Sequence, residues 1–155
     1  MKLRLILILS LALLSCSKDQ AVYKPTIKID PYELYTEGLD GFKKNQFFFA
    51  SKKFAEAEIN FTSPEAAAKS AIMTSFSLYA INFYEEAEEN LLRYIKTYPV
   101  DKHVMYAHYL LSIISYEQNG EEKNDLKPLL DAKKKIDYFL KKYPNSEYAI
   151  DLRLK

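Results

Sequence analysis

The stretch FFFASKKFAEAEINF, residues 47–61, has an apolar pattern that predicts a helix and that recurs later in the chain. Its apolar side chains recur in steps of three, four, three and four: Phe47, Ala50, Phe54, Ala57 and Phe61. The same steps recur in YEEAEENLLRYIKTY at residues 84–98 and in LLDAKKKIDYFLKKY at residues 129–143, with alanine always at the second place. This spacing puts all five side chains on one stripe of an α-helix. The sequence therefore predicts three equivalent amphipathic helices, each with an alanine that allows close approach of a neighbour.

Proline marks the boundaries of these helices. Tyr98-Pro99 and Tyr143-Pro144 follow two of the windows, and Pro64 follows the first. Proline cannot continue a helix, but it suits the first helical position. The segments 31–44, 64–82 and 101–119 also have a helical apolar pattern. We expect the helices that follow the prolines to be capped by three residues: Ser63, Asp101 and Ser146.

Each repeat is thus predicted to be a helix, a short turn and a second helix. The turns are expected at Asn45-Gln46 and at Asn82-Phe83, and a longer polar connection is expected over residues 119–128 at one edge of the stack. Residues 146–155 begin a further amphipathic helix. Because a helical solenoid normally ends in a cap with a polar outer face, we expect the sequence to be a fragment of a longer protein; a partner that covers this end is the alternative.

The first sixteen residues, MKLRLILILSLALLSC, combine two basic residues, an apolar run and the single cysteine of the chain. The apolar run at 5–14 would span about 15 Å as a helix, while a bilayer core needs about 30 Å. A secretory signal peptide is therefore favoured over a transmembrane anchor. The single cysteine also excludes an internal disulfide.

The end of this segment, Leu13-Leu14-Ser15-Cys16, resembles the bacterial lipobox. The resemblance implies cleavage before Cys16 and acylation of Cys16, while Ser17 implies sorting to the outer membrane, facing the periplasm. An ordinary signal peptide with an incidental cysteine is the alternative. We predict a signal peptide over residues 1–15, a flexible tether over 16–30 and a folded domain over 31–155.

Charge gives no sign of nucleic-acid binding. Lys2 and Arg4 are the only charged residues before Cys16, so residues 16–155 carry 20 basic and 21 acidic side chains. Such a balance lacks the basic surface that nucleic acid requires. The runs 133–135 and 141–142 consist of lysines, which we interpret as the solvated face of a helix.

No pattern indicates catalysis, a metal site or a cofactor. His103 and His108 are five residues apart and so do not share one face of a helix, unlike metal ligands four apart. The pairs Glu85-Glu86 and Glu88-Glu89 are interpreted as the solvated side of a helix. Phosphate-binding loops and nucleophile motifs are also absent from the sequence. We predict a protein that is not an enzyme and has no catalytic, metal-binding or cofactor-binding residues.

Helical hairpins of this length, with small residues at fixed steps and a terminal proline, resemble tetratricopeptide repeats. The resemblance implies an all-α, right-handed solenoid of about three hairpins plus the start of a fourth. With the lipobox and tether, the chain further resembles the BamD (YfiO or ComL) family of outer-membrane assembly lipoproteins. This second likeness rests on several groups of residues: Glu33-Leu34-Tyr35, Phe47 and Ala50, Tyr84 and Ala87, Tyr94-Ile95, Tyr98-Pro99, Val104-Met105-Tyr106, Tyr109, Tyr143-Pro144-Asn145-Ser146 and Tyr148.

The family resemblance implies a scaffold that assists insertion of β-barrel proteins into the outer membrane. The partners it implies are a BamA-like subunit, met through C-terminal repeats, and unfolded outer-membrane proteins, met through N-terminal repeats. We expect an extended or helical peptide to bind the groove lined by the first helix of each hairpin. The alternative is another periplasmic repeat lipoprotein that serves as an adaptor for cell-envelope enzymes; a weaker alternative is an enzyme.

Overall fold

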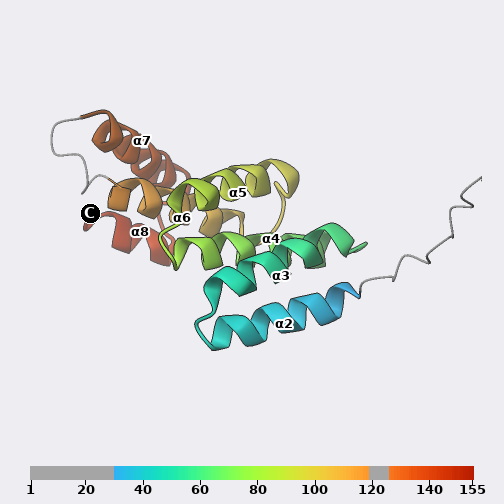
Figure 1. Cartoon of the computed structure of the whole chain (residues 1–155). Coiled ribbons are helices and arrows are strands. Elements are labelled where there is room, and N and C mark those ends of the chain that lie inside the picture. The colour runs from blue at the N-terminus through green and yellow to red at the C-terminus, as the bar shows by residue number, and fades with distance from the viewer. Residues whose placement is uncertain (1–29, 119–125) are drawn as a thin grey trace, which may run out of the picture.

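The computed structural model describes residues 30–118 and 126–155, and every regular element in these two ranges is an α-helix. The helices follow one another as a stack of antiparallel pairs, from α2 at one end of the molecule to α7 and α8 at the other (Figure 1). Their bounds are as follows: α2 Pro31–Lys43, α3 Phe47–Asn60, α4 Pro64–Tyr79, α5 Tyr84–Thr97, α6 Val104–Gln118, α7 Leu126–Lys142 and α8 Glu147–Leu152. The predictions for residues 1–29, including Cys16, lie outside the described residues.

Each helix packs mainly on its neighbours in the sequence, so the chain forms the hairpins α2–α3, α4–α5 and α6–α7, followed by α8. Successive hairpins lie side by side because α3 contacts α4 and α5 contacts α6. This arrangement confirms the predicted all-α fold of tetratricopeptide-like hairpins. A stack of this kind buries a continuous core only where neighbouring repeats meet.

The predicted apolar stripes form that core. The alanines at the second place of each window, Ala50, Ala87 and Ala132, are 0%, 0% and 1% exposed. The large side chains further along the same stripes are also fully buried: Phe54, Leu91, Tyr94 and Phe139. One cluster joins α4, α5 and α6, and a second joins α6, α7 and α8. Alanine is required at the second place because a larger side chain would separate helices that touch there.

Leu129 departs from the prediction, because its side chain is 52% exposed instead of facing the core. In the other hairpins, the first residue of the window packs on an aromatic ring five residues earlier. Phe47 contacts Phe42, and Tyr84 contacts Tyr79. The residue five places before Leu129 is Asn124, so the longer connection supplies no aromatic side chain at this spacing.

Both predicted short turns are confirmed, and asparagine has a physical role in each. Asn45 and Asn82 have φ angles of 59° and 61°, the left-handed conformation that asparagine tolerates better than most residues. The next amide then reaches back into the preceding helix: Gln46 N donates to Gly41 O at 2.8 Å, and Phe83 N donates to Leu78 O at 3.0 Å. These bonds satisfy carbonyls at the helix end and reverse the chain sharply.

Two of the three predicted helix caps are confirmed. The Ser63 hydroxyl accepts from Ala66 N at 3.4 Å, and the Ser146 hydroxyl accepts from Ala149 N at 3.2 Å. The Asp101 cap is wrong, because α6 begins only at Val104. The Asp101 carboxylate instead accepts from the amide of His103 at 2.8 Å and holds a turn before the helix.

Residues 119–125 of the predicted third connection lie outside the described residues, but its predicted end at Pro128 is wrong. Helix α7 begins at Leu126, so Pro128 lies in its first turn and not at the end of a loop. Proline is tolerated there because amides in the first turn have no partner within the helix. Among the described residues, no helix is both long enough and apolar enough to cross a bilayer.

Candidate partner-binding face

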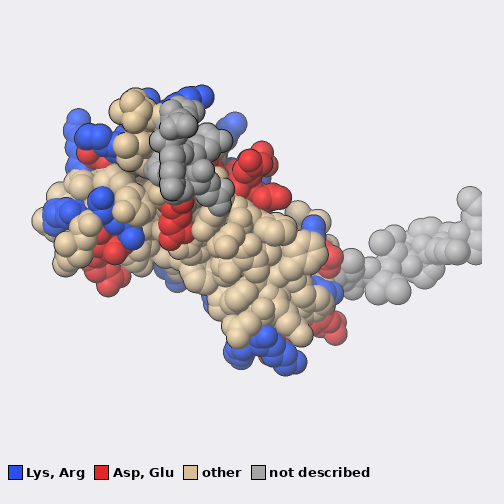
Figure 2. Space-filling view, turned by 60° about the vertical axis from the view of Figure 1, so that its left-hand side comes forward, with Lys and Arg blue, Asp and Glu red and all other residues tan. Residues whose placement is uncertain are grey.

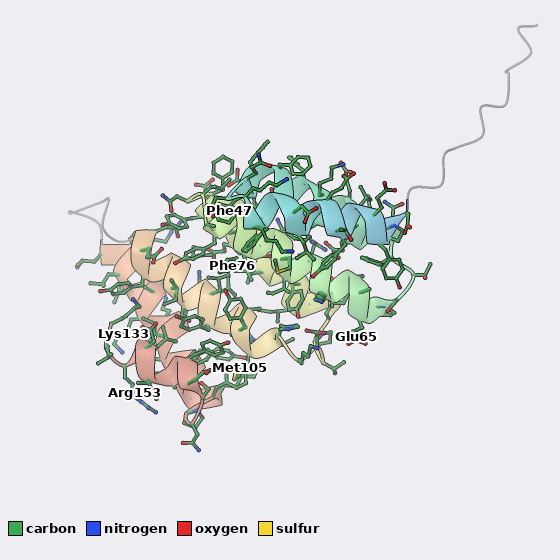
Figure 3. The ribbon with its side chains drawn as sticks, turned by 90° about the horizontal axis from the view of Figure 1, so that it is seen from below. Phe47, Glu65, Phe76, Met105, Lys133 and Arg153 are labelled. Atoms are coloured by element: carbon green, nitrogen blue, oxygen red, sulfur yellow. The ribbon has the colours of Figure 1, made fainter. Side chains whose placement is uncertain are left out.

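A strip of aromatic rings crosses the first helices of successive hairpins. Phe42 on α2 contacts Phe76 on α4, with ring centroids 5.7 Å apart, and Phe76 contacts Tyr106 on α6 at 6.4 Å. Tyr106 contacts Tyr148 on α8 at 5.7 Å, and Tyr148 stacks on Tyr109 at 4.6 Å. Figure 3 shows this side of the molecule, with Phe76 labelled among the side chains of the central helices. We call these five residues the aromatic strip.

The strip is only partly buried, so its rings both join the hairpins and face outward. Phe42, Phe76, Tyr106, Tyr109 and Tyr148 are all intermediate in exposure. Ring pairs of this kind contribute about 0.5–1.5 kcal/mol each beyond the area they bury. The same rings remain available to a partner, because aromatic side chains offer large contact area at low entropic cost.

The tyrosine hydroxyls along this face differ in their partners. Tyr79 OH donates to Glu117 at 3.0 Å, and Tyr109 OH donates to Asp151 at 2.9 Å. Burial, followed by the hydrogen bond to Glu117, raises the pKa of Tyr79 to about 12. Burial also raises the pKa of Tyr106, whose hydroxyl has no hydrogen-bond partner within residues 30–118 and 126–155. The hydroxyls of Tyr79 and Tyr109 are thus engaged within the stack, whereas burial separates that of Tyr106 from solvent.

The opposite side of the stack is tied together by ion pairs between the second helices. Glu58 on α3 is buried and accepts two hydrogen bonds from Arg93 on α5, at 2.6 Å and 2.7 Å. Tyr98 OH donates to the same carboxylate at 3.0 Å. Paired and hydrogen-bonded in this way, a buried carboxylate is tolerated and fixes how two neighbouring hairpins stack.

A second tie joins α5 to α7. Lys135 Nζ donates to Glu88 at 2.6 Å and to the Ser115 hydroxyl at 2.6 Å. This corrects two of our interpretations, since Glu88 and Lys135 are both half-buried partners and not solvated residues. Glu88 directly follows the core alanine Ala87, and Lys135 lies three residues after the core alanine Ala132. Both side chains therefore turn toward the neighbouring hairpin. Glu89, Lys133 and Lys134 are exposed as expected.

The two histidines lie in separate settings. His103 Nδ1 contacts Asp101 at 2.9 Å, and the same carboxylate accepts a hydrogen bond from the Tyr94 hydroxyl. Burial alone would raise the pKa of Asp101, but the hydrogen bonds from Tyr94 and His103 lower it. His108 packs on Tyr138 instead, with ring centroids 5.2 Å apart. Within the described ranges, no group of three or more histidine, cysteine, aspartate or glutamate side chains is arranged to hold a metal ion.

Sequence reasoning located the helices of this face but not its residues. It assigned the tyrosines of the family likeness to the scaffold, including Tyr106, Tyr109 and Tyr148, and named no residue of the aromatic strip as a contact. It also missed Glu58 and Arg93, because 35 residues separate them and no local spacing signals their pairing. Tyr106 and Tyr109 were the available signal, because each combines an aromatic ring with a polar hydroxyl and both lie on the first helix of a hairpin.

The fold places the chain among helical-repeat proteins built from tetratricopeptide-like hairpins. The comparisons with known proteins then assign it more narrowly. Residues 28–155 match the model of the YfiO family, described as an outer membrane lipoprotein. The chain belongs to this family, and the fold predicted from the family resemblance is confirmed.

Two curated relatives carry the same name, outer membrane protein assembly factor BamD. The chain is 33% identical over 135 residues to the protein of Caulobacter vibrioides, covering 85% of this chain and 44% of the relative. It is 28% identical over 122 residues to the protein of Rickettsia prowazekii, covering 79% of this chain and 49% of the relative. The chain therefore spans about half the length of the curated relatives that it matches.

Proposed function

We propose that this chain is a non-enzymatic scaffold of the machinery that inserts β-barrel proteins into the outer membrane. The observation that carries the proposal is the match of residues 28–155 to an outer membrane lipoprotein family, together with two relatives named as assembly factors. The stacked hairpins support it, because such arrays bind partners through extended surfaces and need no catalytic residues.

The lipid anchor belongs to the same proposal. Cys16 at the end of the apolar segment would be acylated, and the chain would attach to the outer membrane facing the periplasm. Several acyl chains hold a protein on a bilayer far better than one, since each buried methylene contributes about 0.8 kcal/mol. Attachment would confine the repeats near the membrane and raise their local concentration beside other membrane-bound subunits.

Recognition would take place on the aromatic strip. Phe42, Phe76 and Tyr106 offer ring faces to the apolar side chains of an unfolded outer-membrane protein. A BamA-like barrel-forming subunit is the proposed stable partner. The ties between the second helices would keep the strip rigid, which lowers the entropy cost of binding.

A crosslinking experiment tests the face. The Phe76→Ala and Tyr106→Ala variants should reduce crosslinking of the full chain to an unfolded outer-membrane protein about tenfold, because hot-spot aromatics cost about 1–2 kcal/mol or more on truncation. Tyr138→Ala is the matched control, since Tyr138 is an exposed aromatic residue on α7 outside the strip. Unchanged helical circular dichroism establishes that the variants remain folded. Equal losses in all three variants, or none, would contradict the proposed face.

Co-purification from membranes tests the role. Recovery of a barrel-assembly subunit with the chain supports the proposal, whereas recovery of a peptidoglycan hydrolase instead would favour the adaptor for cell-envelope enzymes.

Cys16→Ala should abolish acyl labelling and release the protein from the outer-membrane fraction. Persistent labelling and attachment in that variant would show that Cys16 is not the anchor.

A further inference from the structure

The tip of the first hairpin has an unusual composition. Residues 41–55, GFKKNQFFFASKKFA, hold four lysines and five phenylalanines and contain no acidic residue. The chain as a whole is nearly neutral, with a net charge of +1. Positive charge and aromatic side chains are therefore concentrated at this end of α2 and the start of α3.

Several of these aromatic rings lie at the surface. Phe48 is 54% exposed and Phe49 is 44% exposed. Phe48 also contacts Phe83, which is 40% exposed and begins the next hairpin turn, with ring centroids 6.1 Å apart. Lys52 Nζ lies 5.4 Å from the Phe48 ring centroid, and Lys53 Nζ lies 5.6 Å from that of Phe49. A contiguous exposed apolar patch with a basic edge is typical of an interaction surface.

The second hairpin shows that the fold does not require these residues. The repeat offset of 37 residues aligns Phe47 with Tyr84, so Phe48 and Phe49 correspond to Glu85 and Glu86, and Lys52 corresponds to Glu89. All three glutamates are exposed on α5. The same helical positions thus accept acidic residues in one hairpin and hold phenylalanine and lysine in the other. Formation of a hairpin therefore does not require phenylalanine or lysine at these positions.

The positive charges at the tip are largely unneutralised. Lys53 pairs with Glu37 at 2.6 Å, but Lys43, Lys44 and Lys52 form no ion pair with any residue in the described parts of the chain. All three are exposed. Figure 2 shows lysine and arginine side chains projecting at the lower end, where the α2–α3 turn comes forward, beside a wide uncharged area.

We propose that this tip, formed by Phe48, Phe49 and Phe83 with Lys43, Lys44 and Lys52, docks on a lipid surface that carries anionic headgroups. Exposed rings enter the interface of a bilayer, while lysines extend toward phosphate groups and keep their stems in the apolar layer. Each lysine at such a surface favours the docked state about fivefold. The tip would then orient the stack relative to the membrane.

The inference rests on the proposed lipid anchor, which would keep the chain at the membrane. The fourteen residue steps from Cys16 to Asp30 can span up to about 50 Å, and α2 adds about 20 Å from its start to the tip. The tip therefore lies within reach of the bilayer that holds the anchor. Docking requires no change in the fold of the hairpin.

A single tryptophan provides the test, because the chain has none. The lipidated full chain carrying Phe48→Trp is placed in phosphatidylcholine vesicles with or without phosphatidylglycerol, using acyl chains brominated at defined depths. The matched control is Glu85→Trp, at the corresponding position of the second hairpin. With phosphatidylglycerol, we expect a blue-shifted emission and at least about threefold stronger bromine quenching for Phe48→Trp than for the control. Adding Lys43→Gln, Lys44→Gln and Lys52→Gln should remove most of this difference.

Equal quenching of the two tryptophans in anionic vesicles would overturn the proposal. So would strong quenching that is indifferent to phosphatidylglycerol and to the lysine substitutions. Failure of the anchor gives a different result, because neither variant would then sediment with vesicles of phosphatidylcholine alone. Failure of docking alone leaves both proteins in the sediment with the tryptophan at position 48 exposed to water.

Discussion

The tie between the first two hairpins can be tested by removing one side of its ion pair. Arg93→Met keeps a flexible apolar stem on α5 but deletes both hydrogen bonds that the guanidinium donates to Glu58. The Glu58 side chain is 6% exposed, so its carboxylate would stay buried with a single remaining hydrogen bond, from Tyr98. A buried charge that loses its partner is costly because water cannot replace the lost bonds.

The size of the loss follows from the geometry. Breaking a fully buried ion pair costs about 3–5 kcal/mol, and one charge-assisted hydrogen bond is worth about 1.5–3 kcal/mol. Because the Arg93 side chain is 47% exposed, solvent already screens part of the interaction, which places the loss at the lower end. We expect the free energy of unfolding to fall by about 2–3 kcal/mol. For a domain of about 125 residues, this lowers the melting temperature by about 10 °C.

Urea and thermal unfolding followed by circular dichroism measure this loss. The double variant Glu58→Gln/Arg93→Met leaves no buried charge at this site, so it should lose less stability than the sum of the two single variants. Lys133→Met is the matched control, because its ion pair with Asp137 is exposed on both sides and should contribute below about 0.5 kcal/mol. If Arg93→Met costs no more than this control, or if the single losses simply add, Glu58 and Arg93 do not hold the hairpins together.

Three further changes test the packing and the polar network. Gly38→Ala would place a methyl carbon 2.7 Å from the Phe54 ring, so it should destabilise the fold by about 1–3 kcal/mol in urea unfolding, and an unchanged midpoint would show that α2 and α3 can separate. Ala87→Leu adds volume at a fully buried position and should cost about as much, measured in the same way. Tyr79 has a pKa of about 12 in the fold, above its ordinary value of 10.0, because it is buried and bonded to Glu117; its contribution is complete below pH 10 and is lost as pH rises to 12. Tyr79→Phe should therefore flatten the fall of stability between pH 10 and 12, and an unaltered slope would contradict this assignment.

Local sequence patterns were sufficient to predict the structure of each single hairpin. The steps between Phe47, Ala50 and Phe54 repeat the 3.6-residue period of the helix, so they located the buried stripe without any knowledge of neighbours. Asparagine and proline act through backbone conformation, which is equally local, and both short turns were found correctly. The prediction was wrong at Asp101, whose carboxylate holds a turn before α6, and at Pro128, which the first turn of α7 tolerates.

What the sequence by itself determined is therefore the order of the described helices and most of their buried faces, with Leu129, Glu88 and Lys135 as exceptions, together with the likeness to a lipoprotein family. These follow from periodicity and composition, which each segment carries alone. Only the tertiary structure decided which side chains meet across hairpins, such as Glu58 with Arg93 or Phe76 with Tyr106. Those contacts depend on how the hairpins stack on one another, and the repeat offset aligns equivalent positions without indicating which side chains of neighbouring hairpins meet.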